Sequence, residues 1–312
     1  MRRHNLALGA GIAAVSTLSA LLVVGVAATW SQATPAPRDT ATGRPVPPPA
    51  AASATPTPTP TPSAARTPVP ARLVRARLTR SLDRYLRDRP GQVSLSIRDR
   101  STGFTYTYAR KVRTGTASIV KVDILIALLL RARAAGRPLT AAETTLAAQM
   151  IKYSDNKAAD ALWAGIGGAA GLAAANEKLG LRDTVPSPVW GATSTSAADQ
   201  VRILRALTSA AGPLAALDRR YVLDLMENVT PEQAWGVGAA AGDRDLVALK
   251  NGWLPRPVDG GRWTINSIGR VRGSGHDYLI AVLSRRHPSM AAGIETVEHV
   301  AELVTAALSQ SS

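Results

Sequence analysis

The sequence predicts an α+β fold: an antiparallel sheet built from both chain ends, flanked by helices, with an inserted all-α subdomain. Apolar and polar residues alternate near residues 93–108 and again beyond residue 245, as in half-buried strands. The stretch between them has helical periodicity, with N-cap residues and glycine stops. A proline-rich segment precedes the first predicted helix, so we place one folded domain at residues 71–312.

Residues 1–30 have the pattern of an export signal. Arg2 and Arg3 precede an uncharged, apolar stretch at residues 6–28, whose length suits a signal peptide or one N-terminal membrane anchor. We therefore expect an extracytoplasmic protein, secreted or anchored to the cell membrane, that touches the membrane only through residues 6–28 if they are uncleaved.

Residues 31–70 are predicted to be a disordered linker rich in Pro, Thr and Ala. Thr and Pro alternate over residues 55–62, a pattern that favours extended polyproline conformation at about 3.1 Å per residue. Such a spacer separates a membrane or secretion signal from the folded domain.

The net charge and the residue content indicate which classes of binding partner and cofactor to expect. The formal charge of +15 favours anionic partners, and an anionic cell-wall polymer fits an exported protein. Nucleic acid is not expected, because the arginines are scattered and no basic segment is interleaved with aromatic residues. The chain has no cysteine and no metal-ligand motif, so we expect no disulfide, metal or other cofactor, and we expect a monomer.

The first elements of the domain are a helix and a hairpin. Apolar residues recur at helical spacing over residues 73–86, and the arginines between them either grip an anionic surface or form a solvated face. Strands at residues 93–97 and 104–108, joined by a turn, give the hairpin.

The remaining elements follow in order. Helices are expected over residues 118–135, 140–153, 157–163, 169–179, 196–210 and 219–228, with Thr140 and Glu143 as a capping box. Residues 182–195 read as a loop. Strands at 245–250, 262–269 and 278–283 and a helix over 290–308 close the domain.

Ser118 and Lys121 are three residues apart at a helix start and share one face. A lysine with a lowered pKa can take the serine proton, although this pair alone also fits an ordinary cap followed by a surface lysine. Ser154-Asp155-Asn156 and Lys250-Asn251-Gly252 follow in the chain. S-x-x-K, S-D-N and K-T-G together are the penicillin-recognising signature.

With these motifs in register, the domain from about residue 71 to 310 resembles a class A β-lactamase, within the superfamily of serine β-lactamases and penicillin-binding proteins. The resemblance implies the β-lactamase/transpeptidase-like fold. It also implies that Ser118 becomes acylated, that Lys121 accepts its proton, that Lys250 lowers the pKa of Lys121, and that Ser154 relays a proton to the leaving nitrogen.

The resemblance further implies the substrate-binding residues. Asn156 would bind the substrate's side-chain amide and orient Lys121, while the N–H groups of Ser118 and Trp253, beside Gly252, would form an oxyanion hole. Arg262 is a candidate second holder of a substrate carboxylate, because its guanidinium offers a bidentate fork.

The sequence departs from the family pattern twice. Asn251 replaces the hydroxyl residue beside Lys250, and its amide would donate to the substrate carboxylate with different geometry. The loop over residues 181–195 lacks the Glu that activates the deacylating water in class A enzymes; Glu177 lies too early, and Asp183 too near the loop start. Deacylation is therefore expected to be slow.

The first functional interpretation is an exported serine hydrolase, acylated at Ser118 by β-lactams or by D-alanyl peptides of peptidoglycan. The alternatives are a D,D-peptidase or esterase of the cell wall, a sensor that traps a β-lactam or muropeptide without turnover, and a tethered protein with an idle site.

Overall fold

The computed structural model describes residues 69–310. The predictions for residues 1–30 and 31–68 lie outside this range. The described part is built on a five-stranded antiparallel sheet with strand order β2-β1-β7-β6-β5. Its strands are β1 (Gln92–Asp99), β2 (Thr105–Tyr108), β5 (Leu246–Arg256), β6 (Arg262–Gly273) and β7 (His276–His287).

The sheet joins the two ends of the domain, as the sequence predicts. β1 pairs with β7 along its whole length, from Gln92 opposite Arg285 to Asp99 opposite Tyr278. β5 is an edge strand that pairs only with β6, with Lys250 opposite Ile268. This leaves the other side of β5 free to meet the helical block.

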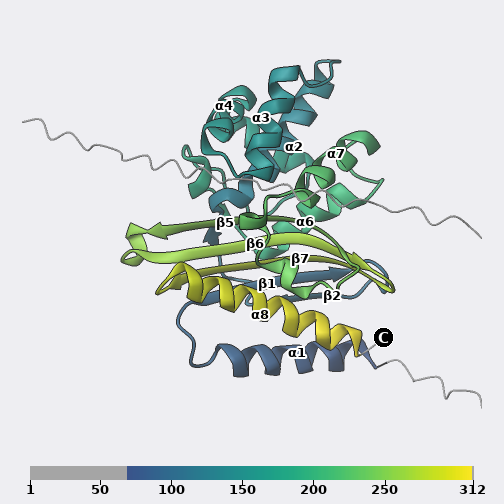
Figure 1. Cartoon of the computed structure of the whole chain (residues 1–312), viewed down its shortest axis with the longest axis vertical. Coiled ribbons are helices and arrows are strands. Elements are labelled where there is room, and N and C mark those ends of the chain that lie inside the picture. The colour runs from purple at the N-terminus through teal and green to yellow at the C-terminus, as the bar shows by residue number, and fades with distance from the viewer. Residues whose placement is uncertain (1–68, 311–312) are drawn as a thin grey trace, which may run out of the picture. The chain divides into compact units, whose positions relative to one another are not determined.

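Helices cover both faces of the sheet (Figure 1). One face carries α1 (Ala71–Leu86) and α8 (Met290–Ser309), which pack on each other and bury Leu78, Leu82, Val300 and Val304. On the other face stands the helical block: α2 (Val120–Ala134), α3 (Ala141–Lys152), α4 (Asn156–Ile166), α5 (Gly168–Lys178), α6 (Ala197–Thr208) and α7 (Ala216–Glu227). The α+β architecture with an inserted all-α subdomain is confirmed.

Local signals explain where the helices begin. The Thr140 hydroxyl accepts from the Glu143 N–H, and the Glu143 carboxylate accepts from the Thr140 N–H, which is the predicted capping box of α3. Of the 15 residues of α2, 12 are buried, and these are apolar except for Lys121 and Asp123, so α2 forms the centre of the block. Within residues 69–310 no single helix is long and apolar enough to cross a membrane; only α4 and α5 taken together, bent by 76°, reach that length and composition.

Candidate active site

Ser118 lies in a short 3₁₀ turn, Ala117–Ile119, which leads directly into α2. The residue before it, Ala117, is buried and has φ 48°, a left-handed conformation that costs a non-glycine residue of order 1–3 kcal/mol. The turn lies against Gly252 of β5, where a β-carbon would come within 2.6 Å of the Ser118 nitrogen and 2.7 Å of the Ile119 nitrogen. Only glycine at residue 252 lets the strand approach the serine so closely.

Lys121 projects from the first turn of α2 and is completely buried. Its Nζ donates hydrogen bonds to the Ser154 carbonyl at 2.6 Å, to Asn156 Oδ1 at 2.8 Å and to Ser154 Oγ at 3.2 Å. Ser154 itself has φ 56° in the tight connection between α3 and α4. The second motif is thus tied to the first through the lysine.

Lys250 reaches the same hydroxyl from the sheet. Its Nζ lies 3.0 Å from Ser154 Oγ and donates a second bond, also 3.0 Å, to the Asn251 carbonyl. Two amines from distant parts of the chain therefore converge on the Ser154 hydroxyl, next to the turn that carries Ser118. Among residues 69–310, no hydrogen bond holds the Ser118 hydroxyl itself, and this side chain is partly exposed.

Burial lowers the pKa of both lysines because the charged form loses its water. The pKa of Lys121 falls to about 8, with Asp155 and Asp160 partly opposing the effect of burial. The pKa of Lys250 is well below its usual range, since burial is reinforced by the positive charge of Lys121. One of these amines can therefore be neutral near physiological pH and act as a base.

Asn251 does not face this cluster, which corrects the prediction that its amide binds a substrate carboxylate. Its Nδ2 donates to the carbonyls of Gln233 and Trp235, each at 2.8 Å, and its side chain is fully buried. These two bonds hold the segment that precedes β5 in place. If the Asn251 amide turned toward a substrate, the two backbone carbonyls would lose their hydrogen-bond donor, which costs free energy.

Arg262 also lies away from the cluster. It stands at the start of β6, opposite Arg256 at the end of β5. Its side chain is exposed and donates to the Arg286 carbonyl at 3.4 Å. The prediction that it holds a substrate carboxylate is therefore not supported by its position.

Asn266 of β6 is a site residue that sequence reasoning did not single out. It is fully buried; its Nδ2 donates to the carbonyls of Gly115 and Thr116 at 2.9 and 3.1 Å, and its Oδ1 accepts the Ser284 N–H. It thereby fixes the segment that leads into Ser118. Asparagine is depleted in β-strands, and its presence within β6 is the sequence signal that could have identified it.

The loop after α5 covers Lys121 with an indole ring. Trp190 lies with its ring centroid 5.0 Å from Lys121 Nζ, and its Nε1 donates to Asp160 of α4 at 2.7 Å. Asp183, the carboxylate within the loop, accepts from Ser196 at 2.9 Å and pairs with Arg113 at 2.6 Å. Glu177 is exposed on α5. The loop thus presents the Trp190 ring to Lys121, while the Asp183 carboxylate is bound by Ser196 and Arg113.

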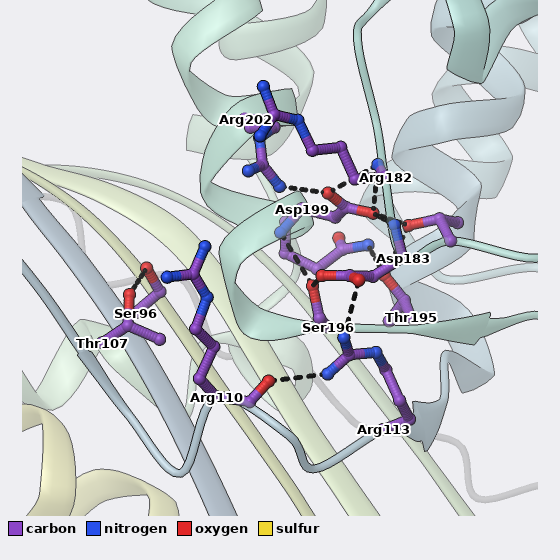
Figure 2. Close-up of polar contacts among 12 residues, drawn as sticks. Ser96, Thr107, Arg110, Arg113, Arg182, Asp183, Thr195, Ser196, Asp199 and Arg202 are labelled. Atoms are coloured by element: carbon purple, nitrogen blue, oxygen red, sulfur yellow. Dashed lines mark hydrogen bonds and ion pairs between the residues drawn. The ribbon is translucent and has the colours of Figure 1, made fainter.

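A network of charged groups anchors this loop at both ends (Figure 2). Asp199, fully buried near the start of α6, accepts from the Asp183 N–H at 2.7 Å, from the Arg182 N–H and from the Thr184 hydroxyl, and it pairs with Arg202. Burial alone would raise the pKa of Asp183, but the bonds from Ser196 and Arg113 hold it below its usual value. The loop is therefore fixed where it leaves and rejoins the helices.

Within the described part of the chain, no three His, Cys, Asp or Glu side chains gather as a metal site would require. The polar side chains gathered here are the Ser154 hydroxyl, the amines of Lys121 and Lys250 and the Asn156 amide, and the carboxylates of Asp155 and Asp160 act on Lys121 from nearby. Such a set suits acyl transfer through a serine ester.

Comparison with known proteins agrees with this geometry. A family model described as "Beta-lactamase enzyme family" matches residues 134–308, more than half of the chain; the match contains Ser154 and Lys250 and begins after Lys121. The chain is 32% identical over 202 residues to "Putative lipoprotein LppW" of Mycobacterium tuberculosis and of Mycobacterium bovis, and covers 62% of the length of these relatives.

Solved structures of similar fold include TLA-1 extended-spectrum β-lactamase (TM-score 0.68, 17% identity, 75% of this chain and 99% of that one). A class A β-lactamase from Mycobacterium abscessus has a TM-score of 0.64 at 20% identity, over 74% and 99% of the chains. PBP-A has a TM-score of 0.65 at 21% identity, over 75% and 96%. The chain belongs to the beta-lactamase enzyme family and has the fold of class A β-lactamases and PBP-A.

Proposed function

We propose that this protein is an exported serine hydrolase whose Ser118 is acylated by β-lactams or by D-alanyl peptides of peptidoglycan. The observation that carries the proposal is the convergence of Lys121 and Lys250 on the Ser154 hydroxyl, beside the Ser118 turn. A neutral amine next to a serine can take its proton, and a bridging hydroxyl can deliver a proton to the departing nitrogen.

The proposed acylation consists of one bond formation, one bond cleavage and two proton transfers. Ser118 Oγ forms a bond to the lactam or peptide carbonyl carbon, its proton passes to Lys121, and the carbon–nitrogen bond breaks. The leaving nitrogen receives a proton through Ser154, and Lys250 attracts the substrate carboxylate. The N–H groups of Ser118 and Trp253 are proposed to stabilise the oxyanion, at about 2.7–4 kcal/mol per donor.

Deacylation is proposed to be slow, because the loop offers Trp190 where an activating carboxylate is needed. A missing general base costs about 10²–10⁴ in rate. This favours a second candidate, a binding protein that traps a β-lactam or muropeptide as a stable ester. The lipoprotein relative fits a location outside the cytoplasm for either function.

Intact mass measurement after mixing with benzylpenicillin tests the proposal. We expect an adduct of the mass of the drug in the natural protein and none in Ser118→Ala, while Ser309→Ala on α8 serves as a matched control and should be labelled normally. Absence of the adduct in the natural protein would refute acylation. Rapid turnover of a chromogenic cephalosporin would refute slow deacylation and exclude the trap.

A further inference from the structure

The guanidinium of Arg256 lies beside the backbone of Gly115, three residues before Ser118. A β-carbon at Gly115 would collide with Arg256 Nη1, and it would lie 3.4 Å from Cζ and 3.6 Å from the Gly191 carbonyl oxygen of the loop. The arginine thus fits into a space that exists because residue 115 lacks a side chain. This space is bounded by the Ser118 segment and by the loop that carries Trp190.

Arg256 is half-buried, and within residues 69–310 its guanidinium takes part in no hydrogen bond or ion pair, whereas its backbone carbonyl accepts from the Gly261 N–H. Arg113 and Arg270, which are also half-buried, pair with the carboxylates of Asp183 and Asp277. Removing part of the water from a guanidinium without supplying an acceptor is unfavourable. An external anion can supply the missing acceptor, because a guanidinium can donate two parallel hydrogen bonds to one carboxylate.

The direction of β5 identifies which part of a substrate would meet this guanidinium. Lys250 contacts Ser154 on one side of Gly252, and Gly252 contacts the Ser118 backbone. Arg256 lies four residues farther along, on the other side. If the leaving group departs toward Ser154 and Lys250, the acyl side arm extends toward Arg256. This step rests on the proposed function.

We propose that Arg256 forms an anion subsite for the acyl side arm, so that the preferred acyl donor is a β-lactam or D-alanyl peptide with a carboxylate on that arm. Gly115 is its positioning partner, because it makes room for the guanidinium. The subsite is separate from the Lys250 end of the cleft, where the leaving-group carboxylate binds.

A matched pair of penicillins tests the subsite. Adipoyl-6-aminopenicillanic acid has a flexible side arm ending in a carboxylate, and heptanoyl-6-aminopenicillanic acid has an uncharged arm of similar length. The measured quantity is the ratio of their second-order rates of Ser118 acylation, followed by intact mass. We expect the anionic compound to react about tenfold faster, which corresponds to about 1.4 kcal/mol.

Two variants should abolish this preference for different reasons. Arg256→Gln removes the charge. Gly115→Ala keeps the charge but displaces the guanidinium, and the β-carbon meets no other atom closer than Arg256 Cζ at 3.4 Å. Arg272→Gln removes one positive charge from an exposed position on β6 and should leave the ratio near ten.

The outcomes separate the two proposals. Equal rates for the two penicillins in the natural protein, or a ratio that survives both Arg256→Gln and Gly115→Ala, would overturn the subsite while leaving acylation intact. If neither compound acylates Ser118, the proposed function fails. Equilibrium binding of adipoyl-6-aminopenicillanic acid to the same variants then decides the subsite: tighter binding that needs Arg256 supports it, and equal binding overturns it.

Discussion

At the scale of single residues, the site depends on what burial does to an amine. Lys121 and Lys250 are among the largest fully buried side chains of the domain, yet each keeps hydrogen-bond acceptors around its nitrogen. The acceptors hold the amines in place, while the loss of water lowers their pKa. This combination favours a neutral amine at one of the two lysines, as the proposed acylation of Ser118 requires.

The pH dependence of acylation follows from Lys121. Its pKa is about 8, and only the neutral amine can accept the Ser118 proton, so the rate should rise about tenfold per pH unit below pH 8 and level off above it. The measurement is the second-order rate of labelling by a fluorescent penicillin from pH 6 to pH 9. A rate that is constant over this range would show that Lys121 is not the base.

Which site residues the sequence could predict depends on how local their signal is. Ser118, Lys121, Ser154, Asn156 and Lys250 belong to short motifs with a characteristic spacing. The structure brings the last four into one hydrogen-bonded cluster, and the Ser118 backbone lies against Gly252. Whether a strand residue faces this cluster depends on the strand register and on the surrounding loops. A short motif contains no information on either. Asn251 and Arg262 were assigned to substrate binding from motif position and residue type, whereas their side chains make other contacts, and Asn266 was not singled out.

At the scale of elements, the sequence predicted the helices and strands well because their periodicity and caps are local. The hydrophobic alternation that defines β1 extends over the whole strand. β5, β6 and β7 are each longer than predicted, because most of their additional residues do not alternate between apolar and polar and are held by pairing with the neighbouring strand. The short ladder between Thr114–Gly115 and Ser194–Thr195 gave no sequence signal, because it has only two residue pairs.

Asp199 anchors the loop that follows α5, and its substitution tests this role. In Asp199→Asn one acceptor oxygen becomes an NH₂ group that faces backbone N–H donors, so we expect a loss of about 1–3 kcal/mol in the free energy of unfolding. The amides of Arg182 and Asp183 should exchange faster in hydrogen-exchange mass spectrometry.

Arg202→Gln is the matched control, because it removes the ion pair to Asp199 and keeps the bonds to the loop backbone. Its loop amides should exchange nearly as slowly as in the natural protein. Equal acceleration in both variants would contradict the assignment of Asp199 as the anchor of the loop.

At the scale of the whole molecule, the folded domain should be independent of the segment before it. α1 starts at Ala71, and the Pro70 carbonyl accepts from the Leu73 N–H at 2.8 Å. A change of 1 kcal/mol in the free energy of unfolding shifts Tm by about 2–4 °C in a domain of this size. Removing residues 1–68 should shift Tm by less than that and should leave the rate of acylation unchanged.

A longer deletion provides the contrast. Removing residues 1–79 takes away Val74 and Leu78, which are buried between α1 and α8, and each buried aliphatic side chain contributes about 1.5–3 kcal/mol. This variant should melt at a clearly lower temperature. Equal loss in the shorter deletion would mean that the domain extends into the first 68 residues.

The pairing of β1 with β7 also bears on when the protein becomes reactive during its synthesis. The serine turn leaves the ribosome well before Lys250, and β5 needs β6 as its neighbour, which in turn needs β7 and β1. A nascent or prematurely terminated chain therefore lacks the second amine and the strand that supports it. The proposed acylation therefore requires that the chain has been made through β7, so we expect copies that end before this strand to leave carbonyl compounds unchanged.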